Sequence, residues 1–373
     1  DFMRGVLIGC VLCCVAVSGV PIETKGPNVF TWDTPPMFWQ MGNTTGVVSD
    51  DAAKLLGHYF SMVVFTKAHG RDSTTQTVEE AVESSCAQIK ALNPRAMCLI
   101  YQNTHILFPN YKIVDEIKSG HSNWLLKDKK GHLIKDQGSP FIDYRKQGAG
   151  QFYLQDAADV IKKGSVDGVN LDRYSYADGL VDMGLGTTGA HSYYKQQDIA
   201  AAWLQDQVPK GTLVFAHCDF IRPSNKPCRN FARIPTNGLA SECFWPTKTA
   251  INALEAATKV GKAVKAEAKV DCKDKPTMVT TLAAFLIAAG PGTVLMCGEF
   301  DNTGADITLY DEYIKPLGAP TGPANTSGRV WRREFASGTK VAFDTESNTG
   351  TISWSDTTVS TGGRVKGKPP TCG

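Results

Sequence analysis

Short apolar runs and amphipathic segments alternate along most of this chain. The apolar runs are rich in β-branched side chains, which is typical of strands buried on both faces of a parallel sheet. Eight such runs occur, at residues 29–32, 61–66, 97–101, 168–171, 212–217, 239–243, 263–268 and 293–297. The pattern therefore predicts eight strands.

Amphipathic segments with helix-capping signals separate these runs. Ser49-Asp50 precedes the first, and Asn93-Pro94 ends the second. The predicted helices cover residues 50–60, 77–92, 149–163, 191–207, 247–260 and 276–289. Alternating strands and helices favour a (β/α)8 TIM barrel, with a doubly wound open sheet as the structural alternative. No Gly-x-Gly-x-x-Gly motif directly follows a predicted strand, which disfavours a dinucleotide-binding version of that alternative.

The pattern changes after Pro316. Residues 329–335 and 340–343 alternate around Ser337-Gly338, and residues 351–354 follow another turn, which predicts a small β extension. The expected organisation is a signal peptide at 1–19, a catalytic-type barrel domain at 20–320, a C-terminal β extension packed on the barrel at 321–356, and a disordered tail at 357–373.

The first residues have the pattern of a secretory signal peptide. Arg4 precedes an apolar run that is too short to span a bilayer, and the small residues Ser18 and Gly19 follow. A single membrane anchor is the alternative. We expect cleavage, secretion and no membrane association of the mature chain.

Cysteine usage agrees with an exported protein. Eight cysteines remain after the signal, and an even number in a secreted chain indicates disulfide bonds. Cys218 and Cys228 flank one predicted loop and are the preferred local pair, while the other pairings stay open. No spacing is that of a zinc site. Sequons at Asn43 and Asn325 indicate a glycoprotein.

The charge pattern excludes one class of partner. The formal net charge is +2 and the cations are scattered, so nothing supports electrostatic capture of nucleic acid. The lysines between Lys259 and Lys269 alternate with Ala and Val, and we interpret them as a solvated helix face that runs into a strand.

Polar side chains follow most of the predicted strands. Parallel strands of a barrel end at the same mouth, where such barrels place their functional loops, so we expect these side chains to meet there. The candidates are Asp33, Lys67, Tyr101, Asn103, Asp172, Arg173, Tyr174, His217, Asp219, Glu242 and Glu299.

Carboxylates and amides beside aromatic rings suit sugars, which offer apolar C–H faces and many hydroxyls. The aromatic candidates are Trp32, Phe38, Trp39, Tyr101, Tyr174, Phe244 and Trp245. Glycoside hydrolysis needs one protonated and one ionised carboxyl group. Asp172 is the first candidate for the ionised group. Glu242 is the first candidate for the acid/base, because desolvation by Cys243 and Phe244 is expected to raise its pKa, and Glu299 is the second. For each carboxylate the structural alternative is a salt bridge or a helix cap.

Several motifs carry a resemblance to a known family. They are Phe30-Thr-Trp-Asp33-Thr-Pro35, Leu99-Ile-Tyr-Gln-Asn103, Trp124-Leu-Leu-Lys-Asp128 and Asp167-Gly-Val-Asn-Leu-Asp172-Arg173. Over residues 28–355 the chain resembles glycoside-hydrolase-like TIM-barrel proteins called hypothetical glycosyl hydrolase family 15-like. The resemblance implies a glycosidase without fixing its substrate. By analogy with distant retaining barrels, it maps the nucleophile onto Asp172 and the acid/base onto Glu242.

The sequence thus favours a secreted, monomeric, metal-independent glycoside hydrolase that needs no cofactor and acts on a poly- or oligosaccharide. Asp33, Lys67, Tyr101 and Asn103 would line the donor-sugar subsite, and Arg173, Tyr174, His217, Asp219 and Glu299 would complete the substrate-binding set. A retaining enzyme would hold the two carboxyls about 5–5.5 Å apart, an inverting one about 6.5–9.5 Å. The alternatives are an inactive carbohydrate-binding, matrix or cell-wall protein on the same barrel, and a lyase or transglycosidase.

Overall fold

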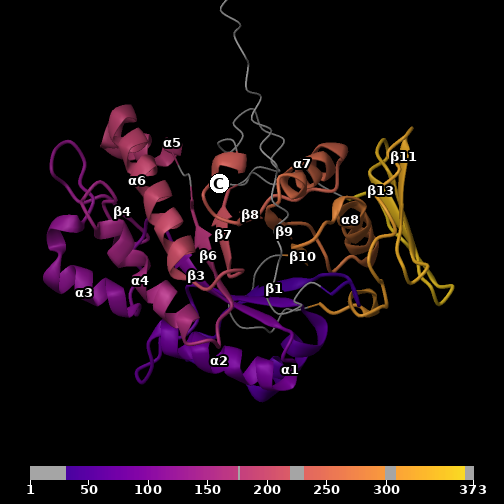
Figure 1. Cartoon of the computed structure of the whole chain (residues 1–373), viewed down its shortest axis with the longest axis horizontal. Helices are drawn as coiled ribbons and strands as arrows, with labels where there is room; N and C mark the ends of the chain where they lie inside the picture. Colours follow the sequence, from indigo (N-terminus) through magenta and orange to yellow (C-terminus); the bar gives the residue numbers. More distant parts are fainter. Residues whose placement is uncertain (1–30, 175–176, 219–230, 299–307, 366–373) are drawn as a thin grey trace, which may run out of the picture.

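A computed structural model describes residues 31–174, 177–218, 231–298 and 308–365 of the chain. Its centre is a sheet of eight parallel strands surrounded by helices (Figure 1). A parallel bridge between Met37 and Leu295 joins the first strand to the last and closes the barrel. The predicted (β/α)8 barrel is therefore confirmed. The strands are β1 (Phe38–Met41), β2 (Met62–Phe65), β3 (Met97–Asn103), β6 (Gly168–Asp172), β7 (Leu213–His217), β8 (Gly238–Ser241), β9 (Ala263–Ala268) and β10 (Thr293–Cys297).

The first barrel strand was wrongly predicted. Residues 29–32 were expected to form it, but the strand begins at Phe38, after Pro35-Pro36. Gln40 interrupts the apolar run there, because its side chain points into the barrel and accepts a hydrogen bond from Lys265. The other seven predicted strands overlap the observed ones.

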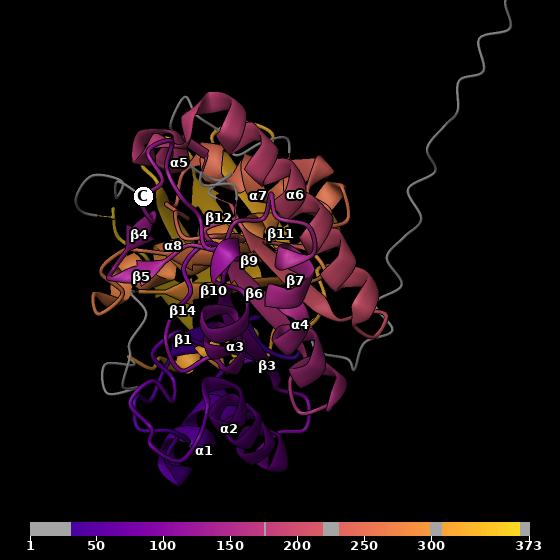
Figure 2. The same ribbon diagram turned by 90° about the vertical axis from the view of Figure 1, so that its left-hand side faces the viewer.

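Helices cover the outside of the barrel, and their starts follow from capping residues. Thr77 and Glu80 form a capping box at the start of α2, and the Asp274 carboxylate accepts a hydrogen bond from the Thr277 N–H at the start of α8. Helices α4 and α6 pack side by side (Figure 2). The helices are α1 (Asp50–Tyr59), α2 (Val78–Leu92), α3 (Lys112–Gly120), α4 (Ala149–Lys162), α5 (Ala177–Leu180), α6 (Gly186–Gln207), α7 (Lys248–Lys259) and α8 (Lys275–Ala288), with short turns η1 (Ser122–Trp124), η2 (Val181–Leu185), η3 (Phe231–Arg233) and η4 (Asp311–Tyr313).

The strand register makes the interior of the barrel polar. Neighbours in register share a face, and alternate residues along a strand return to it. Asn170 pairs with Tyr101 on one side and Phe215 on the other, and Ala240 pairs with Lys265. Among the described residues, polar side chains on this interior face that are no more than 4% exposed include Gln40, Asn103, Asn170, Lys265 and Glu267. The lysine segment expected to be solvated thus contributes Lys265 to the core instead.

A four-stranded antiparallel sheet follows the barrel. It comprises β11 (Val330–Glu334), β12 (Lys340–Asp344), β13 (Thr349–Ser353) and β14 (Val359–Thr361). Helix α8 packs against this sheet as well as against β10 (Figure 1), and every residue from Thr277 to Ala288 is buried. Strand β14 lies within the tail expected to be disordered, so that expectation was wrong there, because β14 pairs with β13.

The cysteines are only partly paired. Cys272 and Cys297 form a disulfide bond with their Cα atoms 5.7 Å apart. Cys218 is also disulfide-bonded, but Cys228 lies outside the described residues, so the preferred local pair stays a prediction. Cys86 and Cys98 are buried free thiols.

The signal peptide expected at residues 1–19 also lies outside the described residues. Over the part of the chain that the structure describes, no helix is both long enough and apolar enough to cross a membrane.

Candidate active site

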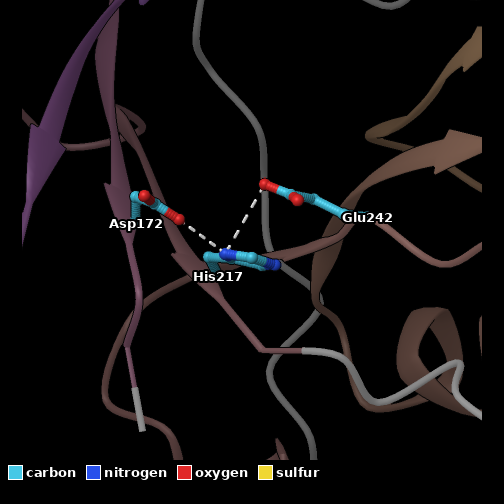
Figure 3. Close-up of side chains that lie close together, drawn as sticks. All are labelled: Asp172, His217 and Glu242. Atoms are coloured by element: carbon cyan, nitrogen blue, oxygen red, sulfur yellow. Dashed lines mark hydrogen bonds and ion pairs between the residues drawn. The ribbon is translucent and has the colours of Figure 1, made fainter. Parts of the chain in front are cut away.

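Three side chains meet at the carboxyl-terminal ends of neighbouring strands (Figure 3). Asp172 ends β6, His217 ends β7, and Glu242 directly follows β8. His217 Nδ1 lies 2.7 Å from Asp172 Oδ1 and 3.7 Å from Glu242 Oε1. The side chains are between 12% and 23% exposed. One imidazole nitrogen therefore lies between two largely buried carboxylates.

Asp172 is held as a carboxylate by donors on several sides. The Tyr101 hydroxyl and the Asn103 amide donate to Oδ2, the latter at 3.2 Å, while the Arg173 N–H donates to Oδ1 at 2.8 Å. Burial alone would raise the pKa of Asp172. The hydrogen bond and charge of His217, together with the Tyr101 and Arg173 donors, outweigh burial and hold this pKa well below its usual range.

Glu242 is also ionised in the free protein. Its Oε2 accepts a hydrogen bond from Lys269 Nζ at 2.7 Å. Burial alone would raise its pKa and the Asp172 charge acts in the same direction, but the positive charges of His217 and Lys269 lower the pKa below the ordinary value. The expected rise through Cys243 and Phe244 was therefore wrong for the free protein, because two cations flank the carboxylate.

The same three side chains offer a spacing at which a cation could be held, since one ligand atom from each lies within 4.8 Å of the others. Ligands about 2.1 Å from an ion lie about 3 Å or more apart. The 2.7 Å between His217 Nδ1 and Asp172 Oδ1 is instead a hydrogen-bond distance. In this structure His217 and Asp172 are therefore hydrogen-bonded to each other.

A buried layer of charged groups lies on the same interior face of β9. Glu267 is 0% exposed and neither carboxyl oxygen has a hydrogen-bond partner. Burial, and then the negative charge of Glu242, raise its pKa to about 8, so Glu267 is protonated at neutral pH. Lys265 Nζ donates to Gln40 Oε1 at 2.7 Å, and burial lowers the pKa of this lysine.

A small hairpin contacts the mouth near Asp172. It is formed by β4 (Lys135–Asp136) and β5 (Ser139–Pro140). Arg173 forms an ion pair with Asp136, and Lys67 Nζ donates to Gln137 Oε1 at 3.3 Å. Burial lowers the pKa of Lys67, although the charge of Asp172 opposes this. The hairpin therefore contacts two of the expected substrate-binding cations, Arg173 and Lys67.

Other expected residues lie elsewhere. Asp33 precedes β1 and pairs with Arg95, which precedes β3, so it lies at the amino-terminal end of the barrel, away from the mouth. It was placed at the mouth because strand one was wrongly predicted. The Tyr174 hydroxyl donates to Asp198 of α6, and its ring is buried in the core. Asp219 and Glu299 lie outside the described residues.

Most of the aromatic residues expected to stack on sugars are packed in the core. Phe38, Trp39, Tyr174 and Phe244 are no more than 5% exposed. Trp32 packs against Phe335 at a centroid distance of 6.0 Å. Buried rings cannot offer a face to a sugar, so the aromatic part of the sugar-binding expectation was wrong for these residues.

The sequence reasoning missed Glu267, Lys265 and Lys269. The signal was present: Lys265 and Glu267 alternate with Val264, Ala266 and Ala268 in a run correctly predicted to be a strand. Charge on one face of a strand that is buried on both faces points to a polar barrel interior.

The fold and the strand-end carboxylates define a glycosidase-like β/α barrel. The chain is similar to the family described as "Hypothetical glycosyl hydrolase family 15", whose model matches residues 235–339. That segment contains Glu242 and Glu267. The resemblance inferred from the sequence is confirmed there.

A solved structure agrees with the fold. The chain is similar to an α-amylase from Geobacillus thermoleovorans, solved in complex with acarbose, with a TM-score of 0.52 and 11% identity over 90% of this chain and 95% of that one. It is also similar to the glycoside hydrolase domain of PelA from Pseudomonas aeruginosa, with a TM-score of 0.46 and 16% identity over 73% of this chain and 96% of that one. The amylase likeness supports the shared barrel and not a shared substrate. A comparison with curated proteins gives no match.

Proposed function

We propose that the protein is a retaining glycoside hydrolase of poly- or oligosaccharides, with Asp172 as nucleophile and Glu242 as acid/base. One observation carries the proposal: an oxygen of Asp172 and an oxygen of Glu242 lie within 4.8 Å of each other at the barrel mouth. Two carboxyl groups whose nearer oxygens are this close fit the short separation of the retaining mechanism, about 5–5.5 Å, better than the about 6.5–9.5 Å of inversion.

Each step can be written with residues of this site. The Asp172 carboxylate attacks the anomeric carbon while a protonated Glu242 gives its proton to the leaving oxygen. The glycosyl ester on Asp172 is then hydrolysed by water, from which Glu242 removes a proton. Tyr101 and Asn103 orient the nucleophile, and Lys67 and Arg173 bind sugar hydroxyls beside it.

Release of reducing ends from a panel of glycans, followed by azide rescue of Glu242→Ala, tests this mechanism. We expect the variant to lose roughly 10²–10⁴-fold in rate on an unactivated glycan, because general-acid assistance is gone. Azide should restore turnover of an activated glycoside and yield a glycosyl azide of retained configuration. A variant with undiminished hydrolysis, or a product of inverted configuration, would refute the assignment.

A carbohydrate-binding protein without catalysis is the second candidate. The ion pair between Glu242 and Lys269, at 2.7 Å, favours it, because an ionised Glu242 is not an acid. Retained glycan binding by the wild type, with no turnover of any panel member, would support this alternative over the hydrolase.

We also propose that the protein is secreted and glycosylated. The Cys272–Cys297 disulfide supports an oxidising compartment. Asn325 is exposed, whereas the Asn43 amide donates to the Val47 carbonyl at 2.8 Å. In a eukaryotic secretory host, Asn325→Gln should therefore remove more glycan mass than Asn43→Gln, as read by gel mobility. Equal mobility of Asn325→Gln and wild type would contradict this.

A further inference from the structure

The proposed acid/base residue needs a source of protons. A general acid must be protonated when the glycosidic bond breaks, whereas His217 and Lys269 keep Glu242 ionised in the free protein. The register of β8 and β9 places another carboxyl group, Glu267, beside Glu242 on the interior face, and the proposed mechanism does not use it.

The register of two strands puts these groups side by side. Ser241 of β8 pairs with Ala266 of β9, so the next positions, Glu242 and Glu267, are neighbours. A hydrogen bond of 2.9 Å from the Phe244 N–H to the Glu267 carbonyl continues the pairing past the end of β8.

The ammonium group of Lys269 lies near the carboxyl groups of both Glu242 and Glu267. Lys269 Nζ lies 2.7 Å from Glu242 Oε2 and 4.0 Å from Glu267 Oε1. Glu267 is 0% exposed and both of its oxygens lack a hydrogen-bond partner. A buried polar group without a partner lowers the stability of the fold, so a purely structural role does not explain this residue. Its side chain cannot contact substrate or solvent directly, so it can influence catalysis only by acting on Glu242.

We propose, on the basis of the proposed function, that Glu267 is a positioning residue that stores the proton used by Glu242 and exchanges it through Lys269. In the forward transfer Lys269 donates a proton to Glu242 and takes one from Glu267. The result is a neutral Glu242 and an ionised Glu267 that is paired with Lys269. After Glu242 has removed a proton from water, the reverse transfer restores the resting state, so no proton is gained or lost.

The groups around Glu267 suit this exchange. Glu242 faces it from the end of β8, Lys265 from β9 and Lys269 from just after β9, and the His217 charge acts on it from β7. On the interior face of β10, Val294 and Met296 are apolar. The two lysines would stabilise an ionised Glu267. The apolar side chains of β10 would suit a neutral Glu267.

Leaving-group dependence in the full-length protein tests the proposal. Glu267→Gln keeps the shape and removes the proton. We expect kcat on an unactivated glycan to fall about 100-fold, within the range of general-acid effects. On a dinitrophenyl glycoside, which needs no protonation, we expect less than about a threefold loss on the same grounds. The upper limb of the kcat–pH profile should lie near the pKa of Glu267, about 8, in wild type and at lower pH in the variant.

Glu79→Gln is the matched control. Glu79 is a second buried carboxyl whose pKa burial raises, to about 7, but it lies on α2 outside the barrel. Its replacement should leave the leaving-group dependence unchanged. Equal losses on both substrates for Glu267→Gln would mean a structural role and overturn the proposal, as would no loss on either. A wild type without any turnover would instead refute the proposed function.

An infrared measurement tests proton storage at Glu267 even if Glu267→Gln does not fold. The difference spectrum of Glu79→Gln between pH 6 and pH 9.5 should show loss of a buried protonated carboxyl band, since Glu267 titrates near 8. Absence of that band would contradict proton storage at Glu267.

Discussion

At the residue scale, the hydroxyl of Tyr101 decides how firmly Asp172 keeps its charge. It donates to Asp172 Oδ2 and is one of the groups that lower the pKa of this carboxyl. Tyr101→Phe should raise that pKa, so the acid limb of the kcat–pH profile moves to higher pH. Loss of a hydrogen bond to a charged group, about 1.5–3 kcal/mol, corresponds to a rate lower by about 10- to 100-fold.

Tyr111→Phe provides the comparison, because the Tyr111 hydroxyl donates to the Tyr101 carbonyl at 2.8 Å and not to Asp172. Both rings are buried. Similar acid limbs for the two variants would show that Tyr101 has no special influence on Asp172.

The residues whose proximity could be predicted from the sequence share one property, because each lies at the end of a strand. Asp172, His217 and Glu242 could be predicted to be neighbours because parallel strands end at one mouth. Glu267 could not be recognised in the same way, because its role depends on which face of β9 points inward. Period-two alternation alone does not say which face is the interior one.

At the scale of elements, the hydrophobic pattern predicted helix α8 but missed strand β1. Strand β1 was missed because Gln40 breaks its apolar run, and only its partner Lys265, far along the chain, explains a polar residue there. Helix α8 was predicted with nearly its observed bounds. Its apolar character on all sides follows from its burial between the barrel and the C-terminal sheet, as expected for a helix covered on both sides.

The contact between β7 and β8 gives a prediction about stability. A Cβ at Gly238 would lie 2.7 Å from the ring of Phe215 inside the barrel. Gly238→Ala should therefore lower the free energy of unfolding by about 1–3 kcal/mol, the usual cost of overpacking, as measured by urea denaturation.

Gly120→Ala is the control, because Gly120 ends α3 and a Cβ there meets nothing within 4 Å. We expect its unfolding free energy to stay within about 0.5 kcal/mol of wild type. A Gly238→Ala protein as stable as this control would mean that the Phe215 ring moves aside without cost.

At the scale of the whole molecule, two buried histidines make stability depend on pH. Burial lowers the pKa of His69 and of His105 to about 4. An unfolded histidine titrates near 6.5, so between these values the unfolded chain binds protons that the folded chain does not. Stability therefore falls as pH decreases from 6.5 to 4, by at most about 3 kcal/mol for each histidine.

Urea unfolding at pH 7, 5.5 and 4.5 measures this effect. His69→Gln should lower stability at pH 7, because Nδ1 accepts from the Asn43 N–H at 2.9 Å and Nε2 lies 3.0 Å from Ser85 Oγ. The variant should then lose less stability than wild type on acidification. The same change at exposed His191 should leave the pH dependence as it is. Parallel curves for His69→Gln and wild type would contradict the assignment.

The barrel as a whole was predictable because it rests on a repeat: eight apolar runs with helices between them. The family similarity over residues 235–339 agrees with it. The chemistry was less predictable, because the charge of Glu242 is set by Lys269 and His217, which only the folded barrel brings near it.

Hydrolysis of a glycan panel by wild type and by Asp172→Asn tests whether the protein is a glycoside hydrolase with Asp172 as its nucleophile. The substitution keeps the size of the side chain and removes the nucleophilic carboxylate. We expect wild type to release reducing ends from at least one glycan and Asp172→Asn, folded and still binding that glycan, to do so at least about 10³-fold more slowly. Equal rates for the two proteins, or binding without any turnover by the wild type, would contradict this expectation.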